Sequence, residues 1–213
     1  MNDANGEASA PQSAPLKVAV VLLAAGLSSR MGGRNKLLIE IGGEPLVRRS
    51  ARTYLAAGAD VHVVLGHEAG AVRAELADLP LTFVENPNFA VGQPTSVRAG
   101  LDSVPEGYDA LLVALADQAA LMPADIADLL SAFAEGDRSR ILIPYFQGER
   151  GNPVVFPPAI VAEIQAGGRN IGCRQFIDSN PQLTRRYEAL TDHFTLDIDT
   201  PDDLLAFAES GKA

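Results

Sequence analysis

An unbroken apolar run, followed at once by a glycine-containing loop, is the feature that most constrains how this chain folds. The run covers 18–23 and is rich in β-branched residues, which is typical of a parallel strand buried on both faces of a sheet. The loop covers 24–33. Because ligands of open α/β sheets bind beyond the carboxyl ends of strands, this loop is the first candidate site.

Strand and helix patterns alternate after this loop. Further apolar segments predict strands at 61–65, 81–84, 110–115 and 140–143. Helical patterns occupy 45–57, with Pro45 in the first turn, and then 69–77, 95–101 and 123–133. Such alternation predicts βαβ units, right-handed crossovers and a parallel sheet.

Glycine and proline become frequent after Pro144. A short strand is predicted at 154–156, and short helices at 159–165 and 173–178. The last helix has Thr200 as its N-cap and begins at Pro201. No internal repeat or linker is visible, so we expect a single domain over residues 16–213. Residues 1–15, rich in Ala, Ser, Pro and Asn, are expected to form a disordered tail.

The overall charge argues against polyanionic partners. The chain has 27 Asp and Glu against 17 Lys and Arg, a formal net charge of −10, whereas nucleic acid and anionic membranes require clustered basic residues. No apolar run reaches the roughly 18 residues of a membrane span.

The single cysteine, Cys173, excludes an intramolecular disulfide and indicates a reducing compartment. We expect a cytoplasmic protein that binds neither nucleic acid nor membrane.

The loop after the first strand concentrates positive charge within this acidic chain. Arg30, Arg34 and Lys36 lie close together in sequence. The small residues at 24–26 let a ligand approach the backbone closely, and successive N–H groups can hold a phosphate. The loop contains neither a Walker A motif nor G-x-G-x-x-G. These features indicate a phosphate site; a flexible loop with solvated basic residues is the alternative.

One long motif covers the end of the first strand and the loop after it. It reads Leu23-Ala24-Ala25-Gly26-x-Ser28-x-Arg30-Met31-Gly32-x-x-Asn35-Lys36-Leu37-Leu38. It resembles the signature of nucleotidyltransferases related to molybdenum cofactor cytidylyl- and guanylyltransferases. The resemblance implies a Rossmann-like nucleotidyltransferase fold, a three-layer α/β/α arrangement with a mostly parallel central sheet. It implies a nucleoside triphosphate bound by Leu23, Ala24, Ala25, Gly26, Arg30 and Lys36, the last two also catalytic. The sequence Ala-Ala-Gly resembles the cytidylyl branch of the family and favours CTP.

Two aspartates are candidate Mg²⁺ ligands. Transfer from a triphosphate needs a polarised α-phosphate and neutralised pyrophosphate, and Mg²⁺ provides both while binding one or two carboxylates. Asp117 follows a buried apolar run; the resemblance makes it a catalytic, nucleotide-binding metal ligand, although Ala119 replaces a usual proline. Asp199 precedes Thr200-Pro201. This segment resembles the terminal motif of the family, which makes Asp199 a second metal ligand. For each, a turn or helix-capping role is the alternative.

Weaker resemblances lie between these aspartates. Residues 88–101 resemble the loop that contacts the base and ribose, which makes Thr95 and Ser96 nucleotide-binding, although Pro94 departs from the usual pattern. Residues 151–156 and 167–174 resemble elements near the acceptor site and contribute Asn152 and Arg174, with Arg169 in place of a usual Asp.

The resemblance implies an enzyme that transfers CMP from CTP, with Mg²⁺, to a phosphorylated acceptor, molybdopterin being expected. A phosphate monoester needs no dedicated base, so catalysis is positioning and charge neutralisation. The expected partners are these small molecules and, transiently, a molybdenum hydroxylase or its maturation factor. Two alternatives stay open. One is an NAD(P)H-dependent oxidoreductase acting on a heterocyclic pigment, since some proteins similar to this family are named so. The other is a non-catalytic nucleotide-binding protein, since Pro94 and Ala119 depart from the pattern.

Overall fold

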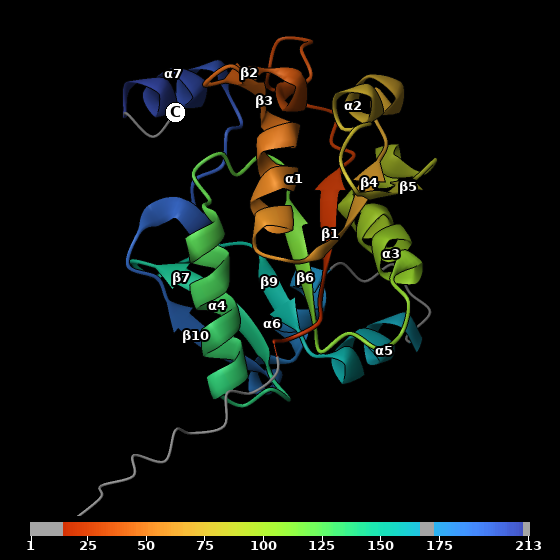
Figure 1. The fold of residues 1–213 in the computed structure, drawn as a ribbon, viewed down its shortest axis with the longest axis vertical. Coiled ribbons are helices and arrows are strands. Elements are labelled where there is room, and N and C mark those ends of the chain that lie inside the picture. Colours follow the sequence, from red (N-terminus) through yellow and green to blue (C-terminus); the bar gives the residue numbers. More distant parts are fainter. Residues whose placement is uncertain (1–14, 167–172, 211–213) are drawn as a thin grey trace, which may run out of the picture.

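The computed structural model describes residues 15–166 and 173–210. Within them, the central sheet has eight strands in the order β10-β7-β9-β6-β1-β4-β5, with β8 paired to β7 (Figure 1). The strands are β1 (Val18–Ala24), β4 (Asp60–Leu65), β5 (Thr82–Glu85), β6 (Ala110–Leu115), β7 (Ile141–Phe146), β8 (Glu149–Arg150), β9 (Val154–Phe156) and β10 (Thr184–Glu188). A separate hairpin joins β2 (Glu40–Ile41) and β3 (Glu44–Pro45).

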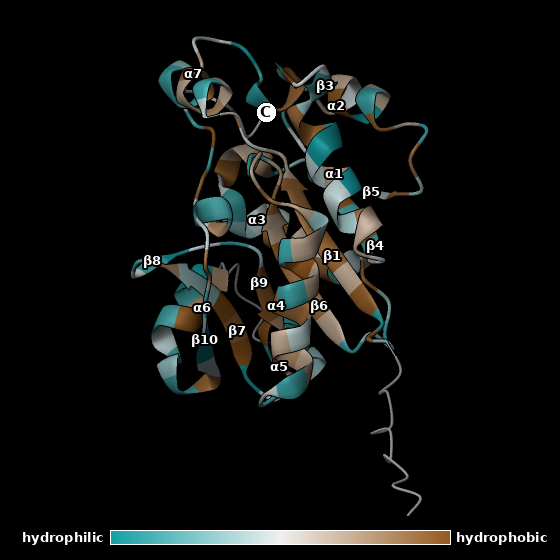
Figure 2. Ribbon diagram, turned by 60° about the vertical axis from the view of Figure 1, so that its left-hand side comes forward, coloured by the Kyte–Doolittle hydropathy of each residue, from teal (hydrophilic) through white to brown (hydrophobic). Residues whose placement is uncertain are grey.

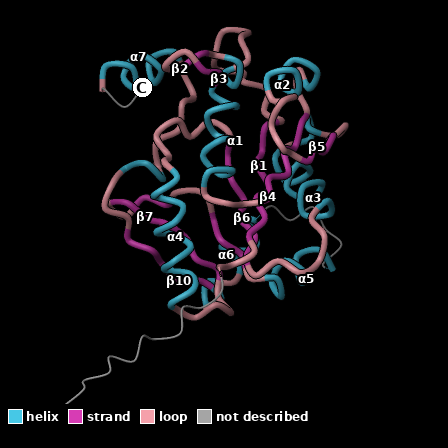
Figure 3. The backbone as a smooth tube through the Cα atoms, viewed as in Figure 1, coloured by secondary structure: helices cyan, strands magenta, loops and turns pink. Residues whose placement is uncertain are grey.

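Seven α-helices of the described residues surround the strands (Figure 3). They are α1 (Leu46–Ala56), α2 (Ala69–Glu75), α3 (Gln93–Ser103), α4 (Pro123–Glu135), α5 (Pro158–Ala166), α6 (Cys173–Ser179) and α7 (Pro201–Glu209). Short 3-10 helices cover Lys36–Leu38, Phe89–Val91, Pro181–Leu183 and Asp192–Phe194. No helix among the described residues is both long and apolar enough to cross a membrane.

The sheet is mostly parallel, as the alternating pattern predicts. Strand β1 pairs in parallel with β4 on one side and β6 on the other, β4 pairs in parallel with β5, and β7 with β10. Strand β9 runs antiparallel to both β6 and β7. The carboxyl ends of β1, β4, β5 and β6 therefore meet at one edge of the sheet.

Two apolar cores form because side chains of β1 alternate between the faces of the sheet. Val18, Val20 and Leu22 pack in a core with α1, α2 and α4, whereas Val21 and Leu23 pack in a second core with α3, α5 and α6. Figure 2 shows the apolar strands enclosed between helices with hydrophilic outer faces. This three-layer arrangement confirms the predicted fold class.

Several sequence predictions need correction. Pro45 ends β3 and occupies the N-cap position of α1, without a capping hydrogen bond, instead of lying in its first turn. Helix α3 begins two residues earlier than expected and ends two residues later. Strand β10 was not predicted, because its sequence Thr-Arg-Arg-Tyr-Glu carries three charges at the sheet's edge. The predicted tail over residues 1–15 lies, except for Pro15, outside the described residues.

Candidate functional site

The carboxyl ends of β1 and β6 open into a cavity of about 360 Å³. Leu23 and Leu115 are register partners at the ends of these strands, so the loop after β1 and the turn after β6 start side by side. The cavity is lined by Leu23, Ala25, Gly26, Leu27, Ser28, Ser29, Arg30, Lys36, Leu37, Phe89, Ala90, Gly92, Gln93, Ser96, Leu115, Asp117 and Asp199. Most of the nucleotide-binding residues expected from the sequence thus lie around one cavity; Ala24 and Thr95 do not line it.

Local hydrogen bonds set the position of Lys36. The side chain of Asn35 caps the short helix that starts at Lys36, its Oδ1 accepting the Leu37 N–H at 3.1 Å. Ser28 Oγ accepts the Lys36 N–H at 3.1 Å, and this serine has a left-handed φ of 51°. Met31, only 4% exposed, anchors the middle of the loop. The loop therefore folds back on itself and directs Lys36 towards β6.

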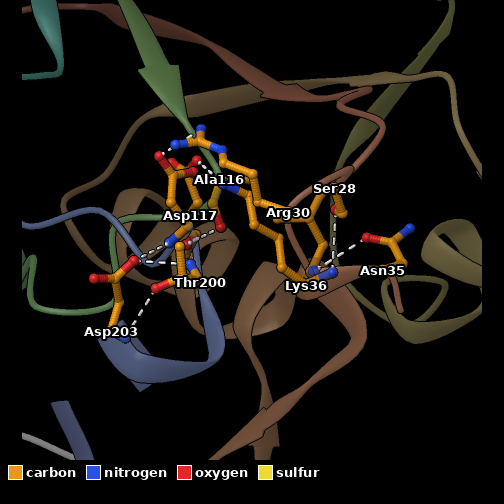
Figure 4. Close-up of polar contacts among 11 residues, drawn as sticks. Ser28, Arg30, Asn35, Lys36, Ala116, Asp117, Thr200 and Asp203 are labelled. Atoms are coloured by element: carbon orange, nitrogen blue, oxygen red, sulfur yellow. Dashed lines mark hydrogen bonds and ion pairs between the residues drawn. The ribbon is translucent and has the colours of Figure 1, made fainter. Parts of the chain in front are cut away.

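Four alternating charges line the cavity as one cluster. Figure 4 shows Arg30, Lys36 and Asp117 among the polar contacts there. Lys36 Nζ lies 2.5 Å from Oδ2 of Asp117 and 2.6 Å from Oδ1 of Asp199. Arg30 Nη2 lies 2.7 Å from the other oxygen of Asp199. The Lys36 side chain is 12% exposed, whereas that of Arg30 is 66% exposed. Arg30 thus forms the open side of the cluster and Lys36 its interior.

The pKa values in this cluster follow from these contacts. Burial lowers the pKa of Lys36, but its charge and hydrogen-bond interactions with Asp117 and Asp199 outweigh burial, so the pKa is raised. Burial raises the pKa of Asp199, but Lys36 and Arg30 outweigh it, and this pKa is lowered. Both residues are therefore charged at neutral pH.

The position of Asp199 depends on the start of α7. Thr200 Oγ1 accepts the Asp203 N–H at 3.2 Å, while Asp203 Oδ2 accepts the N–H groups of Thr200 and Asp199 at 2.7 and 3.0 Å. The Ile198 N–H also donates to the Asp117 carbonyl at 3.1 Å. The capping role is thus carried by Thr200 and Asp203, which leaves the Asp199 carboxylate to face the cavity.

The carboxylates of Asp117 and Asp199 are the side chains of this cavity that could hold a divalent metal ion. One oxygen of each meets the same ammonium group, so both already face a common cation position. Asp117 Oδ1 is buried and has no hydrogen-bond partner among the described residues. No cluster of three or more His, Cys, Asp or Glu side chains suited to a metal occurs in the described part of the chain. Two carboxylates are nevertheless enough for Mg²⁺, which commonly binds one or two carboxylates while substrate phosphates complete its coordination shell.

Asp197 was given no role of its own from the sequence, because only the fold brings it close to Asp117. Burial, together with the negative charges of Asp117 and Asp199, raises its pKa to about 7, against the opposing effect of Lys36. Its Oδ1 is buried and unpartnered among the described residues. Asp197 faces a second cavity beside the first.

This second cavity has a volume of about 450 Å³ and contains the predicted acceptor residues. It shares Leu23, Gln93 and Leu115 with the first cavity, and its further lining includes Asn152, Arg174, Asp197 and Cys173. Burial raises the pKa of Cys173 to about 12, so its thiol is neutral. Arg169 and the rest of 167–172 lie outside the described residues.

Comparison with known proteins identifies the family to which the chain belongs. Residues 20–186 match the family model described as the MobA-like NTP transferase domain. The chain is 30% identical over 199 residues to nicotine blue oxidoreductase of Paenarthrobacter nicotinovorans, covering 86% of this chain and 93% of that protein. It is 26% identical to molybdenum cofactor cytidylyltransferase of Escherichia coli, covering 89% and 94%. A solved nucleotidyl transferase from Methanothermobacter superposes with a TM-score of 0.77 at 24% identity, covering 91% of this chain and 97% of that one.

Proposed function

The chain belongs to the MobA-like NTP transferase family and is a nucleotidyltransferase, and we propose that it transfers CMP from CTP to a phosphorylated acceptor, molybdopterin being the expected one. The observation that carries this proposal is the meeting of Arg30 and Lys36 with Asp117 and Asp199 in one cavity. Two cations suit the triphosphate, and two carboxylates suit its magnesium ion.

In the proposed reaction, a phosphate oxygen of the acceptor attacks the α-phosphorus of CTP. The bond from the α-phosphorus to the bridging oxygen breaks, and pyrophosphate leaves with the electron pair. Lys36 and Arg30 stabilise the negative charge of the triphosphate. Asp117 and Asp199 would hold Mg²⁺, which supplies charge neutralisation at the α-phosphate and the leaving group. The acceptor phosphate is ionised near neutral pH, so no side chain is needed as a base.

The neighbouring cavity supports a two-substrate reaction. Because both cavities share Leu23, Gln93 and Leu115, molecules bound in them would meet above the ends of β1 and β6. Arg174 would bind the acceptor phosphate and Asn152 would orient the acceptor, with an apolar floor that includes Val113 and Val154. Delivery of the product to a molybdenum hydroxylase or its maturation factor belongs to the same proposal.

The choice of CTP is supported by Ala24-Ala25-Gly26 and by similarity to the cytidylyltransferase of Escherichia coli. The test is pyrophosphate release with molybdopterin, Mg²⁺ and each of CTP, GTP, ATP and UTP. We expect turnover with CTP at least tenfold above the others. Asp117→Ala should abolish turnover, whereas Asp78→Ala, at an exposed ion pair with Arg48, should not. Full turnover by Asp117→Ala would refute the metal assignment.

A second candidate function is supported by the similarity to nicotine blue oxidoreductase. Oxidation of NADPH by a quinonoid pigment, followed at the nicotinamide absorbance band, is the test. Thermal stabilisation by NADPH and by none of the nucleoside triphosphates would favour this function over transfer. The pair of carboxylates proposed to bind the metal, Asp117 and Asp199, is the feature that favours transfer, because hydride transfer does not require it.

The packing around Asp117 accounts for Ala119, one of the two departures that favour a non-catalytic nucleotide-binding protein. A proline at position 119 would stiffen this turn, and here Ala119 is fully buried instead. Arg49 Nε donates to the Ala119 carbonyl at 3.0 Å, and Ser50 Oγ donates to the Ala116 carbonyl at 3.0 Å. Contacts with α1 thus hold the turn that proline would otherwise restrain.

A further inference from the structure

Asn86 is a buried polar residue whose hydrogen bonds all lie within the protein. It follows β5 and is 4% exposed. Its Nδ2 donates to Thr95 Oγ1 and to Ser96 Oγ, each at 2.9 Å, and its Oδ1 accepts the Asn88 N–H at 3.0 Å. Both amide protons and the amide oxygen are therefore used, and Asn86 itself does not line the cavity.

The orientation of the Asn86 amide follows from chemistry. The backbone N–H of Asn88 can only donate, so the side-chain atom facing it must be the oxygen. The amide nitrogen must then face Thr95 and Ser96. Consequently both hydroxyl oxygens accept a hydrogen bond from Asn86, and each must donate its own proton elsewhere.

The two hydroxyl groups differ in where that proton goes. Thr95 Oγ1 lies 2.9 Å from the Gly92 carbonyl and 3.0 Å from the Asn88 carbonyl, so its proton has an acceptor within the protein. Among the described residues, Ser96 Oγ has no hydrogen bond other than that from Asn86. Ser96 is 4% exposed and lines the first cavity. Its hydroxyl proton is thus left for a molecule in that cavity.

Sheet order indicates which part of a nucleotide lies near Ser96. Three of the four members of the charged cluster follow β1 or β6, whereas Ser96 lies in α3, which comes after β5. Strand β4 separates β5 from β1 in the sheet. The cavity-lining residues around Ser96, which are Phe89, Ala90, Gly92 and Gln93, are uncharged. An uncharged lining suits the nucleoside, as the cluster of Lys36 suits the phosphates.

We propose that Asn86 is a positioning residue that makes Ser96 an obligate hydrogen-bond donor to an acceptor atom of the bound nucleoside. This inference rests on the proposed function. A base oxygen or nitrogen and the ribose 2′-oxygen share the required acceptor chemistry. In each case Asn86 selects, through Ser96, a ligand that presents an acceptor at this point, because an unmatched buried hydroxyl lowers affinity.

A double-mutant cycle on CTP affinity tests this role. The variants are Asn86→Asp, Ser96→Ala and their combination, with Kd measured by calorimetry in Mg²⁺. An aspartate has nearly the same shape but only accepts, so the Ser96 proton would turn towards it and away from the ligand. The added negative charge weakens CTP binding in both backgrounds and cancels in the cycle. We expect Asn86→Asp to cost about tenfold more affinity with Ser96 present than in the Ser96→Ala background.

Controls separate positioning from folding. Ser103→Ala removes a hydroxyl from the far end of the same helix, where it contacts His62 and the Gly100 carbonyl, and should leave the Kd for CTP unchanged. Asn86→Ala adds neither charge nor acceptor, so it frees the Ser96 hydroxyl without drawing its proton away and should give a coupling of the same sign but smaller. A fall in melting temperature that is equal in both backgrounds, without coupling in Kd, would identify a structural role only and overturn the proposal.

A repeat of the cycle with 2′-deoxy-CTP separates the two acceptors. Coupling that disappears places Ser96 at the ribose, and coupling that persists places it at the base. Equal losses from Asn86→Asp in both backgrounds, with a wild type that binds CTP, would overturn this inference alone. A wild type that binds none of the four nucleoside triphosphates would overturn both this inference and the proposed function.

Discussion

Lys36 Nζ lies 2.5 Å from Oδ2 of Asp117, a residue 81 positions later in the chain. The cation expected to bind phosphate thus stands where the proposed metal-binding carboxylates meet. Asp199, 163 positions after Lys36, accepts from the same ammonium group at 2.6 Å. The charges of these side chains therefore compensate one another, and a nucleotide and a metal ion bound as proposed would together replace the contacts that they break.

We predict that Mg²⁺ and CTP bind cooperatively. CTP alone would draw Lys36 and Arg30 away and leave two unpaired carboxylates, whereas Mg²⁺ alone would have to displace a buried ammonium group. Calorimetry with CTP in EDTA, with Mg²⁺ alone and with both should show CTP affinity at least tenfold higher with the metal. Equal CTP affinity in EDTA and in Mg²⁺ would contradict this coupling.

Replacement of Lys36 by methionine should destabilise the ligand-free protein by about 1–3 kcal/mol, because Asp117 and Asp199 lose their shared partner. The lowered pKa of Asp199 stabilises the native state above the unfolded pKa of about 4, and this contribution is lost as pH falls. The stability difference between wild type and Lys36→Met should therefore shrink on acidification below pH about 4.

Chemical denaturation between pH 3 and pH 7 measures this difference. Added Mg²⁺ at pH 7 should raise the melting temperature of Lys36→Met more than that of the wild type, because the variant exposes both carboxylates to the metal. Arg52→Met, which removes an exposed partner of Glu44, is the control and should show neither effect. A Mg²⁺ response no larger than that of the wild type would speak against a metal site here.

His62 should make stability fall in mild acid. It is 5% exposed in β4, and burial lowers its pKa from 6.5, only partly offset by Asp60. Below pH 6.5 the unfolded chain takes up a proton that the native state resists, so stability declines by less than about 1.4 kcal/mol per pH unit. Urea unfolding at pH 7.5 and pH 5.5 should show a smaller decline for His62→Gln. An unchanged decline would assign the pH dependence to other groups.

Gly100 allows α3 to pack closely against the sheet. A methyl group at this position would lie 2.2 Å from Val21 Cγ1 and 3.0 Å from Val64 Cγ2. We expect Gly100→Ala to lower the free energy of unfolding by about 1–3 kcal/mol. Gly70→Ala in α2 meets nothing within 4 Å and should instead stabilise by up to about 1 kcal/mol. Urea denaturation of both variants checks the pair, and equal effects would contradict the packing argument.

The parts of the fold that depend on local pattern could be predicted from the sequence. The apolar run of β1 and the alternation of strands and helices determined the parallel sheet, because a buried strand needs apolar residues on both faces. Thr200 and Pro201 likewise marked the start of α7. Strand β10 carries too much charge to show the apolar pattern of a buried strand. It forms because it pairs in parallel with β7 at the edge of the sheet.

The candidate site, like the fold, could be predicted from the sequence only in part. The sequence by itself identified Arg30, Lys36, Asp117 and Asp199 as candidates, because their neighbours form recognisable motifs. Only the tertiary structure decided that Lys36 bridges both aspartates, since these contacts join segments that follow different strands. The hydrogen bond by which Asn86 directs Ser96 likewise depends on how the chain folds between β5 and α3, which no local pattern predicts. Local sequence determines which elements form, whereas the order of strands in the sheet determines which loops meet at its carboxyl edge.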